Sequence, residues 1–251
     1  MITKEVKLFS ATNADDFSFM SLFDVCKLTE GKNARIIGGQ MVQLLIEAFP
    51  NPNSYQRRTV DADAALDSEL AATGEIHQAF IAAGYEASSG NSYQKEGRSI
   101  DLLVGSLDGK FKSQIIGERA FDTGPGISSA VNTDPITIQV NATLQSGKEL
   151  KFEARLPRVE TALVIKALIY NSRLKSRDLL DIQNLLWIVK HYPAEEIGGW
   201  TLDLPHKGAR GDAQKALHNL AERLSKKSFS DFPRIEPMEI RQLITLLVAK
   251  P

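Results

Sequence analysis

The chain has 251 residues, of which 43% are hydrophobic and 24% are charged. This composition is ordinary for a globular protein and excludes a disordered, collagen-like or disulfide-rich chain. Thirty basic and 31 acidic residues give a net charge of −1, so the chain lacks the overall basicity of a protein that coats nucleic acid. Any nucleic acid that it binds must be met by a local patch. The length allows one large domain or two modest ones.

Cysteine, histidine and targeting signals are sparse in this sequence. The single cysteine, Cys26, cannot form an internal disulfide, and the four histidines lack the spacing of a zinc site. The N-terminal stretch has no apolar run after its basic residues, so we expect no signal peptide. The sequence contains no stretch of about 18 apolar residues, which is the length needed to span a membrane. We therefore expect a cytoplasmic protein without membrane contact.

Hydrophobic periodicity and turn residues predict alternating helices and strands in the first part of the chain. Asn13 or Asp15 is expected to cap the first helix. In chain order, we predict a helix over residues 16–28, a strand over 34–37, a helix over 41–49, a strand over 60–66, a helix over 68–83, a strand over 85–88, a polar turn over 88–98 and a strand over 99–104.

The rest of the chain changes character at Pro157. Before it, we predict a short strand at residues 115–116, a turn-rich loop at 122–126 and a hairpin with strands over 136–144 and 149–155. After it, the pattern is helical, with helices over 158–171, 176–191, 212–226 and 237–249 and a loop-like stretch at 193–211. We therefore divide the chain into a mixed α/β part, residues 1–157, and a helical part, residues 158–251.

One ordered set of residues in the first part carries chemistry. A predicted strand ends in Gly38 and Gly39 and leads into a helix, and the strand after that helix carries Asp61 and Asp63. Residues two apart in a strand point to the same side, so these carboxylates repel each other and favour a bound cation. Asp101 lies in another predicted strand. A third carboxylate on a neighbouring strand would complete a hard-oxygen site that suits Mg²⁺.

This order of residues resembles the nucleotidyltransferase fold of the DNA polymerase beta type. Its signature is G-[GS], a spacer, D-x-D and a distant third acid on an adjacent strand. Within that fold, the chain is similar to the AbiEii-type nucleotidyltransferase toxins of abortive infection, over roughly residues 34–190. That family shows a GG opening, an R-x-[ST]-x-D-[IL]-D strand and a helical half with spaced Lys, Arg and Asp. Ala62 departs from it, since the family usually carries a branched apolar residue there.

Two further groups of residues match the motifs of that family. Arg57 and Thr59 precede the D-x-D acids, and Lys166 is followed by Asp178 and Asp181 in the helical half. Lys166 lies in an otherwise apolar helix, so its side chain is expected either to reach water or to point into a cleft. In the family, the matching lysine contacts nucleotide phosphates beside a downstream aspartate, which we identify with Asp178. We expect Asp181 to be a capping or salt-bridge residue.

The resemblance implies an α+β fold, with a nucleotidyltransferase-type mixed sheet flanked by helices and followed by a C-terminal helical domain. It implies an enzyme that depends on Mg²⁺, with Mn²⁺ as the other candidate ion. The metal ligands would be Asp61, Asp63 and Asp101. The catalytic set would be these three with Lys166 and Asp178. The nucleotide-binding set would be Gly38, Gly39, Arg57, Thr59 and Lys166.

The reaction implied is transfer of a nucleoside monophosphate from an NTP to a hydroxyl. The acceptor would be an RNA 3′ end, such as that of tRNA, or a protein side chain. The protein would be the toxin of a toxin–antitoxin pair, with an antitoxin protein as partner. Two alternatives stay open: a small-molecule nucleotidyltransferase of the aminoglycoside-modifying kind, and a non-catalytic binding module on the same fold. An acidic, open acceptor cleft would favour the small molecule, and a basic rim would favour RNA.

Overall fold

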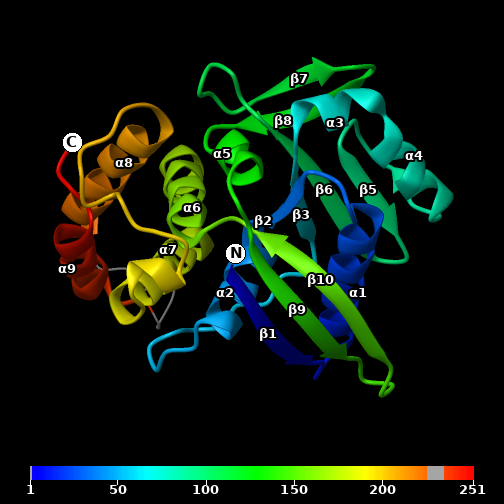
Figure 1. Cartoon of the computed structure of the whole chain (residues 1–251), viewed down its shortest axis with the longest axis horizontal. Helices are drawn as coiled ribbons and strands as arrows, with labels where there is room; N and C mark the ends of the chain where they lie inside the picture. The colour runs from blue at the N-terminus through cyan, green and yellow to red at the C-terminus, as the bar shows by residue number, and fades with distance from the viewer. Residues whose placement is uncertain (1, 225–234) are drawn as a thin grey trace.

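The computed structural model describes residues 2–224 and 235–251, and it confirms the α+β class with a mixed sheet, flanking helices and C-terminal helices (Figure 1). The strands are β1 (Ile2–Phe9), β2 (Ala34–Ile37), β3 (Ala62–Leu66), β4 (Glu86–Ala87), β5 (Ser92–Lys95), β6 (Arg98–Gly105), β7 (Lys112–Ile116), β8 (Arg119–Gly124), β9 (Ile136–Thr143) and β10 (Glu149–Leu156). The helices are α1 (Asn13–Leu28), α2 (Gly38–Ala48), α3 (Ser68–Thr73), α4 (Glu75–Ala82), α5 (Ile127–Asn132), α6 (Val159–Arg173), α7 (Ser176–His191), α8 (Gly208–Leu224) and α9 (Pro237–Leu247), with a 3-10 turn at Ala194–Glu196.

The larger sheet has the strand order β2-β3-β6-β5-β4, and β8 pairs with β6 and β7 beside that path. The β3–β6 and β6–β8 pairs are parallel, whereas β2 is antiparallel to β3 and β5 is antiparallel to β6. The β3–β6 register sets Asp63 opposite Asp101. Because parallel neighbours in register point corresponding side chains to the same face, this pairing brings two of the predicted acids together.

The smaller sheet has the order β1-β9-β10. β9 and β10 form the predicted antiparallel hairpin, which is confirmed and whose inward residues alternate with exposed ones. β1 runs parallel to β9, from Ile2 opposite Ile136 to Phe9 opposite Thr143. The first strand was missed in our sequence interpretation, although its apolar and charged residues alternate. β1 and its parallel partner β9 are far apart in the chain and are not joined by a hairpin turn, so no local sequence signal indicates that they pair.

Two helix predictions need correction in their boundaries. α1 begins at Asn13, and its N-cap is Thr12, whose side chain and that of Asp15 form a capping box, so neither Asn13 nor Asp15 is the cap. The predicted helix over residues 68–83 is two helices, because Gly74 between α3 and α4 has φ +74°. A left-handed residue ends the first helix, and glycine adopts that conformation at little cost.

Two segments predicted as turns contain strands. Residues 88–98 include β5, which pairs with β6 and buries Tyr93 against Phe80, with ring centroids 4.7 Å apart. Residues 122–124, in the predicted loop at 122–126, are the end of β8. Burial of a large aromatic ring and pairing with a central strand override the polar and glycine-rich local sequence in these segments.

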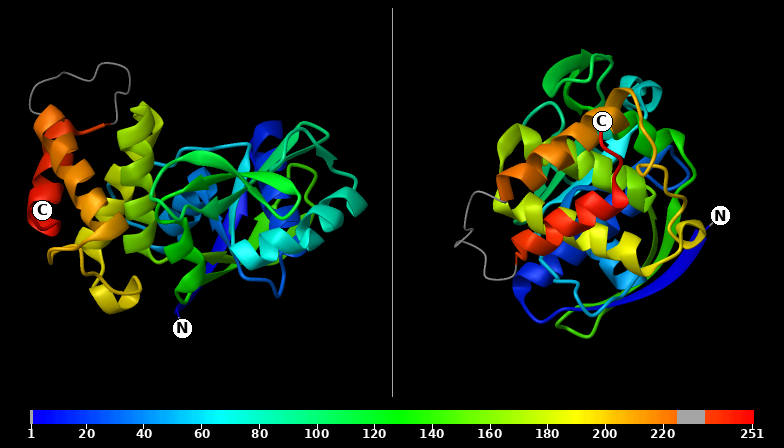
Figure 2. Two further views of the ribbon diagram at one scale, coloured as in Figure 1. Left: turned by 90° about the horizontal axis from the view of Figure 1, so that it is seen from above. Right: turned by 90° about the vertical axis from the view of Figure 1, so that its left-hand side faces the viewer.

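The helical part follows the prediction closely, and α6 and α7 begin and end within two residues of the expected bounds. α8 begins at Gly208, so the loop-like stretch ends before residue 211, and residues 225–226 of the predicted helix lie outside the described residues. α6 to α9 gather at one end of the molecule and α3 and α4 at the other, with the sheets between them (Figure 2). In the described residues, no helix is long and apolar enough to cross a membrane.

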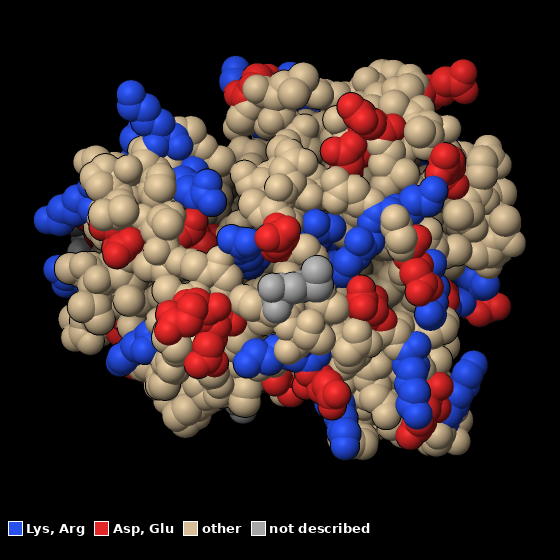
Figure 3. Space-filling model, in the orientation of Figure 1, with Lys and Arg blue, Asp and Glu red and all other residues tan. Residues whose placement is uncertain are grey.

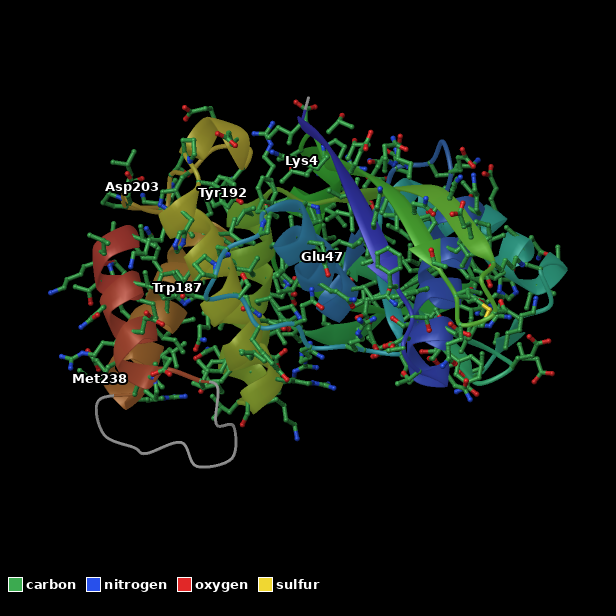
Figure 4. The ribbon with its side chains drawn as sticks, turned by 90° about the horizontal axis from the view of Figure 1, so that it is seen from below. Lys4, Glu47, Trp187, Tyr192, Asp203 and Met238 are labelled. Carbon is green, nitrogen blue, oxygen red and sulfur yellow. The ribbon has the colours of Figure 1, made fainter. Side chains whose placement is uncertain are left out.

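Aromatic contacts join the helical part to the sheets. Phe49, just after α2, packs edge-on against Tyr192, just after α7, with ring centroids 5.2 Å apart. Lys4 of β1 lies over the same Phe49 ring, 5.1 Å from its centroid, and Figure 4 shows Lys4 and Tyr192 on either side of this junction. α2 also packs against α6 and α7. The predicted boundary at residue 157 therefore crosses a packed interface, and the division into two domains stays a prediction.

Candidate active site

Asp63 lies at the centre of the acidic residues. It is half-buried on β3, with Asp101 of β6 as its register partner, and Asp61 directly precedes the strand. Burial raises the pKa of Asp63 to about 6, and the charges of Asp61 and Asp101 add to this rise. The two neighbouring carboxylates raise the pKa further because their negative charges disfavour ionisation of Asp63. The three acids that the sequence predicts as one group are thus close enough to interact electrostatically.

Two hydroxyls orient the outer acids. Thr59 donates a hydrogen bond to Asp61, and Ser92 of β5 donates one to Asp101. Thr59, which was predicted to bind nucleotide, therefore contacts a carboxylate in this structure. Ser92 was missed in our sequence interpretation, because it lies in the segment predicted as a turn. Only its place as register partner of Asp101 gives it this contact.

The two glycines begin α2 and pack against the acidic strand. Gly38 has φ +71°, and a Cβ at this position would lie 1.8 Å from Asp63 Oδ2. A Cβ on Gly39 would lie 2.8 Å from Cγ2 of Thr59. Ile37, the N-cap, makes no side-chain hydrogen bond to the helix start, so no cap side chain satisfies the first amides. This helix start is therefore available to an anion beside the carboxylates.

Replacement of Gly38 by alanine tests this close approach. We expect Gly38→Ala to lower activity by about a hundredfold, because the new Cβ displaces Asp63 and small displacements in an active site are costly. Gly31→Ala is the matched control, since Gly31 has φ +73° and no atom within 4 Å of the corresponding Cβ. Both variants carry the same backbone strain, of about 1–2 kcal/mol. Equal activity of the two variants in a transfer assay would contradict this role of Gly38.

A cluster of opposite charges, with Lys166, Asp178 and Asp181 buried at its centre, lies next to the acids. Lys166 of α6 is 2% exposed, and its Nζ lies 2.7 Å from Asp181 Oδ2 and 4.0 Å from Asp178 Oδ1. Arg57 also binds Asp181, through Nε at 3.2 Å and Nη2 at 2.8 Å. Arg173 binds Asp178 through Nε at 2.6 Å and Nη2 at 2.7 Å. The nearer partner of Lys166 is therefore Asp181, whereas Asp178, which we had matched to it, is held by Arg173.

The two groups are coupled electrostatically. The charges of Lys166 and Arg173 lower the pKa of Asp63, against the larger effect of burial. Hydrogen bonding to Asp178 raises the pKa of Arg173, and the charge of Asp63 adds to it. Arg57 also approaches α2, because its Nη2 lies 3.1 Å from where a Cβ on Gly39 would be. The structure thus brings every predicted site residue into one region, where the larger sheet faces α6 and α7.

The donor atoms in this region fit a divalent cation by their chemistry. Within residues 2–224 and 235–251, no group of three or more His, Cys, Asp or Glu side chains is arranged to hold a metal ion. Asp61, Asp63 and Asp101 nevertheless supply hard carboxylate oxygens, which Mg²⁺ and Mn²⁺ prefer. Burial is the main cause of the raised pKa of Asp63, and a cation would offset both this and the added repulsion from Asp61 and Asp101. The three acids as metal ligands stay a prediction.

Comparison with known proteins gives similar structures but no family. No protein family matches the sequence, and no curated protein does. The solution structure of the antibiotic-resistance factor ANT(2'')-Ia is 10% identical, covers 84% of this chain and 97% of its own, and has a TM-score of 0.44.

Two cyclic dinucleotide-type synthases named CdnE are also similar. The one from Elizabethkingia meningoseptica is 9% identical, covers 92% of this chain and 89% of its own, and has a TM-score of 0.25. The c-UMP-AMP synthase from Rhodothermus marinus is 8% identical, covers 95% and 91%, and has a TM-score of 0.27. At these identities and TM-scores, none of the three structures decides the activity of this chain.

Proposed function

We propose that this protein is a metal-dependent nucleotidyltransferase that moves a nucleoside monophosphate from an NTP to a hydroxyl group. The observation that carries the proposal is the contact between the start of α2 and the acids. Gly38 lies directly against Asp63, and Asp63 is the register partner of Asp101 on the next strand. An anion-binding helix start beside a cation-demanding cluster fits a metal-bound triphosphate. The buried cations next to the cluster supply further positive charge for the phosphates.

In this proposal the chain's own residues bind and orient the reactants. The backbone at Gly38 and Gly39, with Lys166 and Arg57, binds the triphosphate. Asp61, Asp63 and Asp101 would hold the metal. When bound, the metal would neutralise charge on the phosphoryl group as it is transferred. Little covalent chemistry is needed from the protein, because positioning and charge neutralisation supply most of the rate of such transfers.

Asp101 is the residue proposed to accept the proton. The acceptor oxygen forms a bond to the α-phosphorus of the NTP, the bond from that phosphorus to the bridging oxygen breaks, and pyrophosphate leaves. The proton of the attacking hydroxyl passes to Asp101 Oδ. The hydrogen bond from Ser92 holds this carboxylate in place. A carboxylate within reach of the attacking hydroxyl is the group that general base catalysis requires.

The acceptor proposed is an RNA 3′ end, such as that of tRNA, or a protein hydroxyl. The support for a toxin role and for an antitoxin partner is the match of Arg57, Thr59, Lys166 and Asp178 to motifs of the AbiEii-type toxins. Lys, Arg, Asp and Glu side chains are interspersed on the face shown in Figure 3. With a net charge of −1 as well, a nucleic-acid acceptor would have to be bound at the site itself and not by a broad basic surface on this face.

Incubation with labelled nucleotides tests the proposal. The protein is mixed with each of four α-labelled NTPs, Mg²⁺ or Mn²⁺, and total RNA and protein from a bacterial cell. We expect label on RNA or on a protein with the wild type and none with Asp63→Asn. Absence of label in every combination, with the folded wild type, would contradict the proposed activity. Growth arrest on expression of the wild type, but not of Asp63→Asn, would support the toxin role.

A further inference from the structure

A hollow of about 330 Å³ lies between the larger sheet and the last turn of α6. Its volume is within the range of ligand sites in proteins. Strands β6, β7 and β8 form one side of it, and α6 forms the other (Figure 1). Its apolar side chains are Leu103, Phe111 and Ile169, and its charged ones are Lys112, Asp122 and Arg173.

The strand order places this hollow beyond Asp101. Along the row β2, β3, β6, β8, the start of α2 follows β2, Asp63 is on β3 and Asp101 is on β6. Leu103 is two residues after Asp101, so both side chains point to the same face of β6. Its register partner on β8 is Asp122. The hollow therefore begins beside Asp101, on the side opposite the helix start that is proposed to bind the triphosphate.

The lining of the hollow suits an aromatic base more than a polycationic small molecule. Phe111 is 43% exposed, and its ring covers Gly124, where a Cβ would lie 2.8 Å from Phe111 Cε1. An exposed ring held in this way can stack on a base of any sequence. Of the described charged side chains that line the hollow, Lys112 is paired with Asp108 at 2.6 Å and Arg173 with Asp178, and Asp122 is the one carboxylate among them, which is few for a ligand with several ammonium groups.

We propose that this hollow holds the last base of a single-stranded nucleic-acid acceptor, with Phe111 as the stacking residue. The inference rests on the proposed function for the position of the triphosphate and the direction of attack. A base seated against Phe111 places the 3′ end of the same nucleotide toward Asp101, where its hydroxyl can lose a proton. This nucleotide has a phosphate only on its 5′ side, and Arg173 and Lys112 are the cations of the hollow that can contact it.

Phe111→Ala tests the inference, with Ile115→Ala as the matched control. Ile115 is 73% exposed on β7 and does not line the hollow. The probe is a fluorescent single-stranded RNA trinucleotide, whose affinity is measured by anisotropy with no NTP present. We expect Phe111→Ala to weaken RNA binding about tenfold, as expected for loss of one stacked base. Phe111→Trp should restore it, and Ile115→Ala should leave it unchanged.

A second measurement separates the two possible sources of the base. NTP affinity is measured by calorimetry with Mg²⁺ present for the same three variants, and it should stay within twofold of the wild type. A loss of NTP affinity with unchanged RNA affinity would assign the hollow to the donor base and overturn the inference. Unchanged RNA affinity in Phe111→Ala, or transfer of label to protein alone, would also overturn it. Failure of the wild type to transfer any label would refute the proposed function, while the RNA affinities would still decide whether Phe111 binds a base.

Discussion

Asp61→Ala and Asp63→Ala are each expected to lower nucleotide transfer by about a thousandfold or more, while the fold stays intact. The reason is that the cluster would lose a ligand to the metal, and metal stabilisation of a transferring phosphoryl group amounts to several kcal/mol. The measurement is the initial rate of label transfer at saturating NTP. Asp203→Ala is the control, because Asp203 is exposed on the helical side of the molecule and should not affect the rate (Figure 4). Near wild-type rates in either cluster variant would remove the metal-site interpretation.

The stability of Asp63→Asn distinguishes loss of function from loss of fold. The pKa of Asp63 rises from 3.8 to about 6 in the folded protein, so ionisation of this group opposes folding. The penalty is small below pH 3.8, where Asp63 is protonated in both states, grows as pH rises from about 4 to 6, and is essentially complete once pH exceeds the folded-state pKa of about 6. Without metal, Asp63→Asn should therefore raise the free energy of unfolding at pH 8 by about 1–2 kcal/mol and leave it nearly unchanged at pH 3.5. Urea unfolding in EDTA measures both values, and equal stabilisation at the two pH values would contradict this cause.

The elements that could be predicted from the sequence have a local signal of sufficient length. The β9–β10 hairpin has two alternating segments around a short turn, and α6 and α7 have long apolar periods. β5 has neither, because only Tyr93 of its four residues is buried and its surroundings are polar. Its strand conformation depends on pairing with β6 and on the stacking of Tyr93 on Phe80, which are tertiary contacts.

The acids of the candidate site could be predicted because a strand fixes side-chain direction every second residue. The partners of the helical part could not be predicted in the same way. Asp178 and Asp181 are three residues apart on one helix face, so the sequence allows either to contact Lys166. The rotation of α7 against α6 decides between them, and it places Asp181 nearer. The bond from Arg57 to Asp181 joins segments 124 residues apart, and no local pattern indicates it.

Lys166→Met is expected to keep the fold and weaken NTP binding. A lone buried charge would cost several kcal/mol, so the structure supplies an anion to this lysine, and Asp181 is 2.7 Å away. Asp181 does not lose its only partner in this variant, because Arg57 still binds both of its oxygens. The apolar stem of methionine fills a similar volume in the helix. The buried carboxylate therefore stays paired, and the substitution should be tolerated structurally.

The loss of NTP affinity in Lys166→Met separates a phosphate-binding lysine from a structural one. If Asp181 occupies the place of a phosphate in the empty site, the variant loses one charge-assisted bond to the triphosphate. Such a bond amounts to about 1.5–3 kcal/mol, which corresponds to about ten- to 150-fold in dissociation constant. Lys175→Met, at an exposed position between α6 and α7, is the control and should bind NTP like the wild type. Unchanged NTP binding in a folded Lys166→Met protein, measured by calorimetry with Mg²⁺ present, would show that the lysine serves only the ion pair.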